Sequence, residues 1–305
     1  MNHIPVMLKE SIESLNIKEN GIYIDGTFGR GGHSRKILEK LSSGKLIAFD
    51  QDPEAVEFAK KFFDQKNFTI IQKPFSEIQE YCEKNGLINK ISGILFDLGI
   101  SSNQLENANR GFSFQKDGPL DMRMDPSKNI PASEVLKIYN YKKLAKIFLD
   151  FGEEKKSLII AKEIKKTLKR NIKIDTTLKF VKLIEKIIKR RKKIHPATKC
   201  FQALRIYVNK ELEEISKALK NILSVLKPKG RLTIISFHSL ESRIVKKFMK
   251  KCTEVKNKNE YRDFSILKKE HNKSKWIIKK KKPSDKEIKE NRRSRSALLR
   301  TIEKK

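Results

Sequence analysis

Short β-rich segments alternate with helical segments from residue 22 to residue 98, and this alternation is the strongest constraint on the fold. We expect strands at residues 22–25, 45–49, 68–71 and 91–98, separated by helices at 33–41, 53–63 and 76–84. Such a βαβα order produces a parallel sheet with helices on both faces. Ligands of open α/β sheets bind outside the carboxyl ends of the strands, so we expect the functional site there.

The alternation ends after residue 98 and returns near the C-terminus. Gly, Asn, Ser and Asp are frequent at residues 101–124, which indicates a loop, and residues 132–193 show apolar positions at helical spacing. The later pattern is a helix at 211–226 that ends at Lys227-Pro228-Lys229-Gly230, a strand at 231–237, a helix at 240–251 and closing strands at 276–278 and 297–302. We therefore predict a discontinuous sheet domain, residues 1–105 with 205–305, and a loop plus all-helical insert at 106–204.

Basic residues greatly outnumber acidic ones. Lys and Arg number 69 against 37 Asp and Glu, which gives a formal net charge of +32. Such a charge attracts polyanions, and clustered Lys and Arg are typical of nucleic-acid binding. An AT-rich genome also produces many Lys codons, so we expect part of the charge to have that origin. The run at residues 189–193 is therefore either an RNA contact or a solvated surface.

Composition also argues against several other classes of protein. Hydrophobic residues make up 38% of the chain, which is enough for a core. No apolar run approaches the roughly 18 residues of a membrane helix, and the first residues lack a signal-peptide pattern. We therefore expect a cytoplasmic protein with no membrane partner. Cys82, Cys200 and Cys252 lie far apart, so we predict neither a metal site nor a disulfide framework.

A glycine-rich turn follows the first expected strand. The segment from Asp25 to His33 is DGTFGRGGH. Its glycines let the backbone approach a ligand closely, and the helix that follows supplies unpaired N–H groups. The spacing does not match the G-x-G-x-x-G fingerprint, which disfavours a nicotinamide enzyme. An acidic residue followed by such glycines is similar to the first motif of S-adenosylmethionine-dependent methyltransferases of the Rossmann-like class.

Two more strand ends carry carboxylates. Asp50 ends the second strand about 20 residues after the glycine turn, where a ribose diol is bound in such folds, whereas Asp52 fits the N-cap of the next helix better. Asp97 ends the fourth strand, so the loop after it is expected to face the methyl group of the cofactor. Amino methyltransferases commonly carry Asp/Asn/Ser-Pro-Pro-aromatic here, and this chain does not.

Several segments together resemble the family of ribosomal RNA small subunit methyltransferase H, also called the MraW family. They follow that family's order at residues 25–33, 97–104, 110–114, 118–125, 195–198, 201–206 and 236–241. The resemblance implies a class I methyltransferase that transfers a methyl group from S-adenosyl-L-methionine to the 4-amino nitrogen of a cytidine in the decoding region of 16S rRNA. It also implies cofactor contacts at Gly31, Gly32, His33, Asp50, Phe75, Asp97 and Gln104.

The chemistry needs a hydrogen-bond acceptor near the amino group. A cytosine amino group is a weak nucleophile because its lone pair is delocalised, so an acceptor must draw on its protons as the new bond forms. The candidate acceptors are Asp97, Ser101, Asn103 and Asp121, with Asp97 as the first choice for a catalytic residue.

Three further side chains have two interpretations each. Phe112 and Phe114 either stack a flipped base or form one face of a buried strand. His238 either faces the pocket or caps the next helix.

The insert is larger than base capture requires, so we expect it to recognise RNA, and the assembled 30S subunit to be preferred over naked 16S rRNA. Two alternatives are a non-catalytic RNA-binding or ribosome-assembly factor and a DNA amino methyltransferase. The glycine turn and Asp50 argue against the first. The missing Pro-Pro-aromatic tetrapeptide argues against the second.

Overall fold

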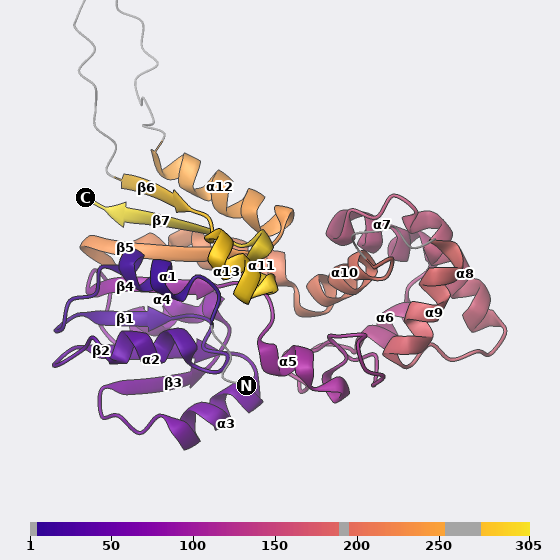
Figure 1. The fold of residues 1–305 in the computed structure, drawn as a ribbon, viewed down its shortest axis with the longest axis horizontal. Coiled ribbons are helices and arrows are strands. Elements are labelled where there is room, and N and C mark those ends of the chain that lie inside the picture. The colour runs from indigo at the N-terminus through magenta and orange to yellow at the C-terminus, as the bar shows by residue number, and fades with distance from the viewer. Residues whose placement is uncertain (1–4, 189–194, 254–275) are drawn as a thin grey trace, which may run out of the picture. The chain divides into compact units, whose positions relative to one another are not determined.

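The computed structural model describes residues 5–188, 195–253 and 276–305. It contains a sheet of seven strands in the order β3-β2-β1-β4-β5-β7-β6, which Figure 1 shows from bottom to top. The strands are β1 (Ile22–Asp25), β2 (Lys45–Asp50), β3 (Phe68–Gln72), β4 (Ile91–Asp97), β5 (Leu226–Ser236), β6 (Trp276–Lys281) and β7 (Leu298–Lys304). Neighbouring strands are parallel except that β7 is antiparallel to β5 and β6. This is the doubly wound order with one antiparallel strand added, so the predicted Rossmann-like α/β class is confirmed.

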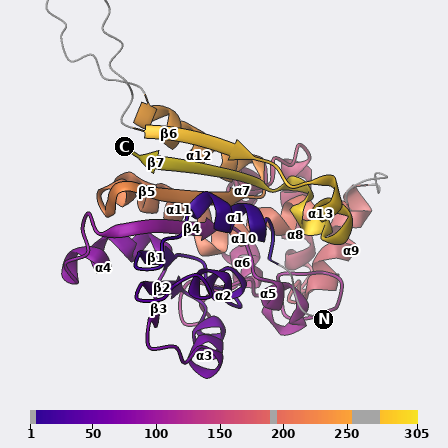
Figure 2. The ribbon, with the colours of Figure 1, turned by 60° about the vertical axis from the view of Figure 1, so that its left-hand side comes forward.

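One helix precedes the strands of this sheet, and others lie between them in the chain. They are α1 (Leu8–Leu15), α2 (Gly32–Leu38), α3 (Pro53–Phe62), α4 (Ile78–Lys84), α11 (Glu211–Asn221), α12 (Ser239–Thr253) and α13 (Asp285–Glu290), with short 3-10 turns η1 (Phe75–Glu77), η3 (Ile222–Ser224) and η4 (Arg292–Ser296). Figures 1 and 2 show α1 beside α2; α1 packs on β4 and β5, and α2 packs on β1 and β2. None of the described helices combines the length and the apolar character needed to cross a bilayer.

The chain divides into two compact units. The sheet unit comprises Met1–Asp50, Val56–Gly99 and Glu214–Lys305, and the helical unit comprises Gln51–Ala55 and Ile100–Glu213. The helices of the second unit are α5 (Ser102–Glu106), η2 (Ala108–Arg110), α6 (Ala132–Ile138), α7 (Tyr141–Gly152), α8 (Ser157–Lys169), α9 (Thr177–Ile187) and α10 (Thr198–Asn209). The sequence prediction places the boundaries near residues 105 and 205 instead, and the use of this unit for RNA recognition stays a prediction.

The start of β5 differs from the sequence prediction. The segment from Lys227 to Gly230 was expected to be a turn before a strand, but β5 already begins at Leu226. Leu226 pairs with Ile91, and the next pair joins Arg231 to Gly93, so an irregularity in the ladder takes up the extra residues. Pro228 fits there because proline within a sheet is confined to edges, strand starts and bulges. The two closing strands, β6 and β7, pair as predicted.

The helical unit has an apolar core of its own. The rings of Phe148 and Phe180 are fully buried, with centroids 6.3 Å apart, and Phe201 lies 5.6 Å from Phe180. Leu144 and Ile147, which the helical spacing predicted to face inward, are buried with them. These side chains come from α7, α9 and α10, so the core joins helices that are far apart in the sequence.

A buried ion pair organises the irregular part of the helical unit. The Arg110 guanidinium lies 2.9 Å from Asp52 Oδ2, and both side chains are less than a tenth exposed. Arg110 also donates to the carbonyl oxygens of Arg123 and Met124, at 3.1 and 2.8 Å. Gln104 Nε2 donates to the same carboxylate at 2.7 Å. The contacts of Arg110 therefore fix the course of the loop between η2 and α6.

We expect Arg110→Met to lower the free energy of unfolding by about 3–5 kcal/mol, because breaking a buried pair leaves the other charge uncompensated. Urea denaturation followed by circular dichroism measures the change. Lys84→Met is the control, since Lys84 forms an exposed pair with Glu80 and such pairs contribute little. Equal losses in the two variants would contradict the role assigned to the buried pair.

Candidate functional site

The sheet has a switch point between β1 and β4. These strands are parallel neighbours, and the connections that follow them lead to opposite sides of the sheet, to β2 and to β5. A crevice forms at the carboxyl ends of strands at such a point, and ligands bind there. Asp25 ends β1 and Asp97 ends β4, while Asp50 ends the adjacent strand β2. The three strand ends that the sequence analysis selected therefore share one edge of the sheet.

Hydrogen bonds tie the glycine turn to both strands. Asp25 is 1% exposed, and its carboxylate accepts from Ser34 Oγ at 2.7 Å and from the Thr27 N–H at 3.1 Å. Thr27 Oγ1 in turn accepts from the Asp97 N–H at 2.7 Å. Burial raises the pKa of Asp25, and the bonds from Ser34 and Thr27 partly oppose that shift. Asp25 thus serves the geometry of the turn rather than contact with a ligand.

The glycines of the turn are required by packing as well as by conformation. Gly31 has φ +70°, and a Cβ there would lie 2.3 Å from the ring of Phe63. A Cβ on Gly32 would lie 2.2 Å from Pro5. These positions favour glycine because neighbouring side chains already fill the space, and at Gly31 also because the φ angle is positive. Gly31 and Gly32 therefore shape the turn in which a ligand contact by their backbone is predicted.

The structure separates the roles of Asp50 and Asp52. Asp50 is partly exposed at the edge of the sheet, and its Oδ2 accepts from the Gly29 N–H at 2.8 Å. Asp52 is 3% exposed, pairs with Arg110 and accepts from the Glu54 N–H at 3.0 Å. Asp52 is thus a helix-capping and ion-pairing residue. Of the two, Asp50 alone faces the glycine turn with part of its surface accessible.

Asp97 lies in a buried environment with unsatisfied hydrogen-bonding capacity. Its Oδ1 is buried without a hydrogen-bond partner in the described part of the chain, and its Oδ2 lies 3.7 Å from His33 Nδ1. Burial raises the pKa of Asp97 well above its usual value, and the negative charges of Asp25 and Glu241 add to the shift. An orphaned buried acceptor at a switch point indicates a place where a ligand completes the hydrogen bonding.

The other predicted cofactor residues are in different situations. Phe75 begins η1 and is partly exposed, with its ring 5.1 Å from that of Phe96. Gln104 is 4% exposed, and both ends of its amide are engaged, with Asp52 and with the Ser101 N–H. A cofactor contact through the Gln104 side chain would have to replace one of these bonds.

The remaining candidate acceptors are also engaged. Ser101 caps α5 by accepting from the Gln104 N–H at 3.3 Å, and Asn103 Nδ2 donates to Glu54. Arg123 binds Asp121 through two side-chain hydrogen bonds, at 2.8 and 2.7 Å. Burial alone would raise the pKa of Asp121, but the bonds and charge of Arg123 lower it below its usual value. Asp121 is therefore a carboxylate held in its ionised form.

The structure bears on the two interpretations of Phe112, Phe114 and His238. Phe112 is 6% exposed in the core of the helical unit, so the base-stacking interpretation of Phe112 is wrong. It lies in a loop rather than in the expected strand. Phe114 is partly buried, with its ring 4.8 Å from that of Phe201. His238 Nδ1 lies 3.5 Å from the Glu241 N–H in the first turn of α12, which favours the capping interpretation.

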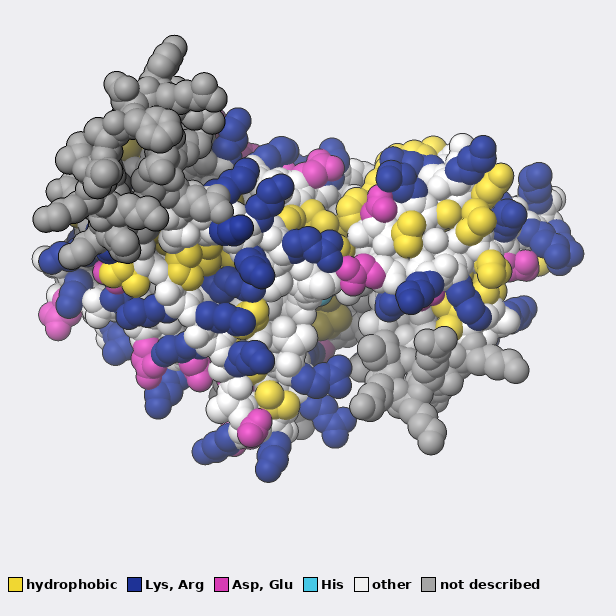
Figure 3. Space-filling model, turned by 90° about the horizontal axis from the view of Figure 1, so that it is seen from above, with side chains coloured by type: hydrophobic (Ala, Val, Ile, Leu, Met, Phe, Trp, Pro, Cys, Tyr) yellow, Lys and Arg dark blue, Asp and Glu magenta, His cyan; other side chains and the backbone are white. Residues whose placement is uncertain are grey.

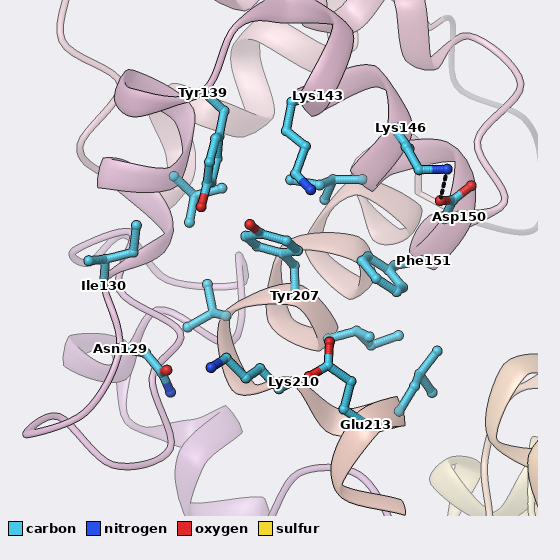
Figure 4. Close-up of a pocket in the computed structure, with 15 residues that line it drawn as sticks. Asn129, Ile130, Tyr139, Lys143, Lys146, Asp150, Phe151, Tyr207, Lys210 and Glu213 are labelled. Atoms are coloured by element: carbon cyan, nitrogen blue, oxygen red, sulfur yellow. Dashed lines mark ion pairs between the residues drawn. The ribbon is translucent and has the colours of Figure 1, made fainter. Parts of the chain in front are cut away.

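The helical unit contains a pocket that the sequence analysis did not find. It has a volume of about 550 Å³, and its lining includes three aromatic rings, three lysines and two carboxylates from α7, α10 and the segments next to them. Figure 4 shows the Tyr207 ring at its centre, with Tyr139 and Lys143 beside it and Lys146 turned to Asp150. Burial raises the pKa of Tyr207 to about 12, with neighbouring Tyr139 contributing. The signal in the sequence was the alternation of aromatic and basic residues, which helical periodicity alone does not separate from core positions.

Comparison with known proteins identifies the family. The model of the MraW methylase family matches residues 1–305. The chain belongs to the MraW methylase family. A protein named Ribosomal RNA small subunit methyltransferase H from Francisella tularensis subsp. novicida is 49% identical over 99% of both chains. One of the same name from Francisella philomiragia is 49% identical over 99% of this chain and 98% of its own.

A likeness to solved structures is weaker. An rRNA methylase from Streptococcus thermophilus aligns over 99% of this chain and 98% of its own, at 12% identity and a TM-score of 0.45. The sheet order, rather than that likeness, establishes the fold class of this MraW family member. The resemblance seen in the sequence motifs is confirmed by the family model.

We expect Asp97→Asn to flatten the dependence of stability on pH. A raised pKa means that folded Asp97 keeps a proton that the unfolded chain releases above about pH 4. The free energy of unfolding therefore falls between that pH and the folded pKa, by about 1.4 kcal/mol per pH unit for one group. Urea denaturation from about pH 4 to about pH 7 should show that the free energy of unfolding of the variant increases relative to that of the wild type as the pH rises.

Asp121→Asn is the matched control, because its lowered pKa gives the opposite sign. That variant should lose stability relative to the wild type as the pH rises through the range in which unfolded Asp ionises. Parallel pH profiles for Asp97→Asn and the wild type would show that Asp97 titrates normally.

Proposed function

We propose that the protein is an rRNA (cytosine-N4-)-methyltransferase that uses S-adenosyl-L-methionine to methylate a cytidine in the decoding region of 16S rRNA. The observation that carries this is the site at the switch point of a chain matched over its full length by the MraW methylase family. There Asp50 and Asp97 end β2 and β4, the two strands that flank β1, and Asp97 Oδ1 has no hydrogen-bond partner in the described residues.

The residues present fit the cofactor. The partly exposed Asp50 carboxylate is suited to accept hydrogen bonds from a ribose diol, and its orientation is set by the Gly29 N–H. Backbone groups of Gly31, Gly32 and His33 line the turn, and Phe75 offers an aromatic edge after β3. When bound, the cofactor supplies an electrophilic methyl group, so the protein has to position the amino nitrogen in line at about 3–3.5 Å.

Asp97 is our first choice for the residue that binds the amino group. Its unpartnered oxygen can accept a hydrogen bond from an amino proton, and that contact strengthens as positive charge develops on the nitrogen. The neighbouring negative charges that raise the pKa of Asp97 are compensated when a cation is bound beside them, which favours the ionised acceptor. Asp97 would then hold the amino group and draw on its proton.

The charge of the protein supports an RNA substrate. Figure 3 shows a face on which Lys and Arg side chains predominate over Asp and Glu, in keeping with the net charge of +32. The pocket of the helical unit adds ring faces and ammonium groups, the combination that binds unstacked nucleotides. The run at residues 189–193, another predicted RNA contact, lies outside the described residues.

The preference for an assembled 30S subunit is a further part of this proposal. The two Francisella relatives are named for the small subunit rRNA, and a decoding-region cytidine acquires its final surroundings only when the RNA has folded around proteins. Recognition by shape and phosphate over a wide surface would favour that folded form. We place the reaction in the cytoplasm, where such particles assemble.

We expect Asp50→Ala to weaken S-adenosylmethionine binding roughly 10- to 150-fold, because hydrogen bonds to a charged group contribute about 1.5–3 kcal/mol. Isothermal titration calorimetry measures the affinity. Asp52→Asn is the comparison. The Asp52 carboxylate is already bound to Arg110 and Gln104, so this variant should lose much less affinity for S-adenosylmethionine. If both variants lose the same affinity, the assignment of the ribose to Asp50 is wrong.

The reaction is tested with a labelled methyl donor offered in parallel to 30S particles, naked 16S rRNA and DNA, followed by digestion to nucleosides. We expect label in N4-methylcytidine, with 30S particles the best substrate. Label in adenine or on a ring carbon would overturn the reaction. Cofactor binding without any transfer would favour the non-catalytic assembly factor, and equal rates on naked RNA would remove only the preference for the particle.

A further inference from the structure

A second hollow of the helical unit has an unusual lining. A shallow groove of about 380 Å³ lies between the start of α7 and one face of α8. One aromatic and several basic side chains line it: Tyr141, Lys162, Lys165, Lys166, Lys169 and Arg170. No carboxylate belongs to this lining in the part of the chain that the structure describes. We call this feature the α8 groove.

The lysines of the α8 groove form one stripe along the helix. Lys162, Lys166 and Lys169 follow each other at spacings of four and three residues, which places them on the same face of α8. Like charges at these spacings destabilise a helix. The helix dipole offsets this cost for Lys166 and Lys169, which lie in the last turn, but not for Lys162. The stripe therefore has an energetic cost that the fold itself does not require.

Some other exposed lysines of the same unit have carboxylate partners. Lys137 pairs with Glu134 at 2.5 Å, and Lys179 pairs with Asp175 at 2.7 Å. In contrast, no ion pair joins Lys162, Lys166 or Lys169 to a carboxylate within the described residues. A genome-wide excess of Lys codons accounts for lysines in both places. The α8 groove differs from these pairs because, among the described residues, its lining contains basic side chains and no carboxylate.

Two side chains of the groove have additional roles. Lys165 Nζ donates to the carbonyl oxygens of Leu136 and Lys137 at the end of α6, at 3.1 and 2.8 Å, so this lysine also holds two helices together. Tyr141 is 36% exposed, and Lys162 Nζ lies 5.8 Å from its ring centroid. A cation beside an accessible ring provides a stacking surface next to a phosphate contact.

We propose that the α8 groove binds the sugar-phosphate backbone of the substrate RNA, with an unstacked base against Tyr141. The proposal rests on the proposed function for the identity of the RNA, and it assigns to α8 a contact separate from the pocket around Tyr207. Charge complementarity favours a polyanion, and the exposed ring favours RNA over an acidic protein segment. Lys162, Lys166 and Lys169 each contact phosphate, while Lys165 keeps its place on α6.

The test is a triple variant, Lys162→Gln, Lys166→Gln and Lys169→Gln, which spares Lys165. Binding of protein-free 16S rRNA is followed by fluorescence anisotropy over a range of salt concentrations. Each lost phosphate contact reduces the slope of log affinity against log salt by about 0.7–0.9, so the slope should fall by about 2. Tyr141→Leu should weaken binding at every salt concentration without changing the slope, because stacking releases no counterions.

The matched control is Lys36→Gln, Lys84→Gln and Lys179→Gln, which removes the same charge from exposed lysines that have carboxylate partners. Its slope should stay near that of the wild type. If the slope falls equally in both triple variants, the effect depends on net charge alone, and the proposal is overturned. An unchanged slope in the α8 variant would also overturn it.

Two further measurements separate this proposal from the others. A loss seen with 30S particles but not with protein-free RNA would make a ribosomal protein the occupant of the groove, which contradicts the proposal. Methyl transfer by the wild type is assayed on the same RNA. If no N4-methylcytidine forms, the proposed function fails, whereas the comparison of RNA binding still decides whether the α8 groove holds RNA.

Discussion

The parallel pairing of β1 with β4 is the constraint on which the rest of the site depends. The connections that follow these neighbours lead to β2 on one side and to β5 on the other, and at such a point a crevice forms at the carboxyl ends of the strands. Thr27 then bonds to both strand ends, through Asp25 and through the Asp97 N–H. The glycine turn, the two carboxylates and the start of α2 are thereby held as one body. A change in that register would move every predicted cofactor contact of the sheet unit at once.

The same arrangement concentrates negative charge where water is scarce. Asp25, Asp97 and Glu241 each carry a carboxyl group, and the pKa of Asp97 rises through burial and through the charges of the other two. Folding therefore places a poorly solvated acid in the site instead of a stable carboxylate. A cationic ligand relieves this situation, whereas an anionic one makes it worse. The charges of the site therefore favour a cationic ligand, independently of its shape.

Much of the sheet could be predicted from the sequence because its signals are local. Alternating segments, strand-terminal carboxylates and the glycine turn all lie within about 80 residues, and the structure places Asp50 and Asp97 as that order implies. The start of β5 was not predictable, since Pro228 and Gly230 are turn signals that a ladder irregularity absorbed. Tertiary pairing decided that segment over local preference.

Contacts between residues far apart in the sequence were also not predicted. The Arg110 motif was visible in the sequence, but nothing local shows that its guanidinium reaches a carboxylate 58 residues earlier. The hydrogen bonds of the Gln104 amide with Asp52 and Ser101 were not visible in the sequence either, and the cofactor contact that the resemblance implies for Gln104 stays a prediction. Motif position identifies residues that matter, but it does not distinguish a residue that contacts a ligand from one that supports the loop around it.

The ion pair of Arg110 also limits how this fold can be divided. The helical unit consists of two stretches of chain, and the shorter one, Gln51–Ala55, carries Asp52 and lies at the start of α3. A fragment cut from Ile100 to Glu213 would contain every helix from α5 to α10 but would lack the carboxylate that neutralises Arg110. The insert is therefore not a module that can be moved to another scaffold by grafting one continuous segment. A graft that keeps this ion pair would have to carry the segment Gln51–Ala55 as well.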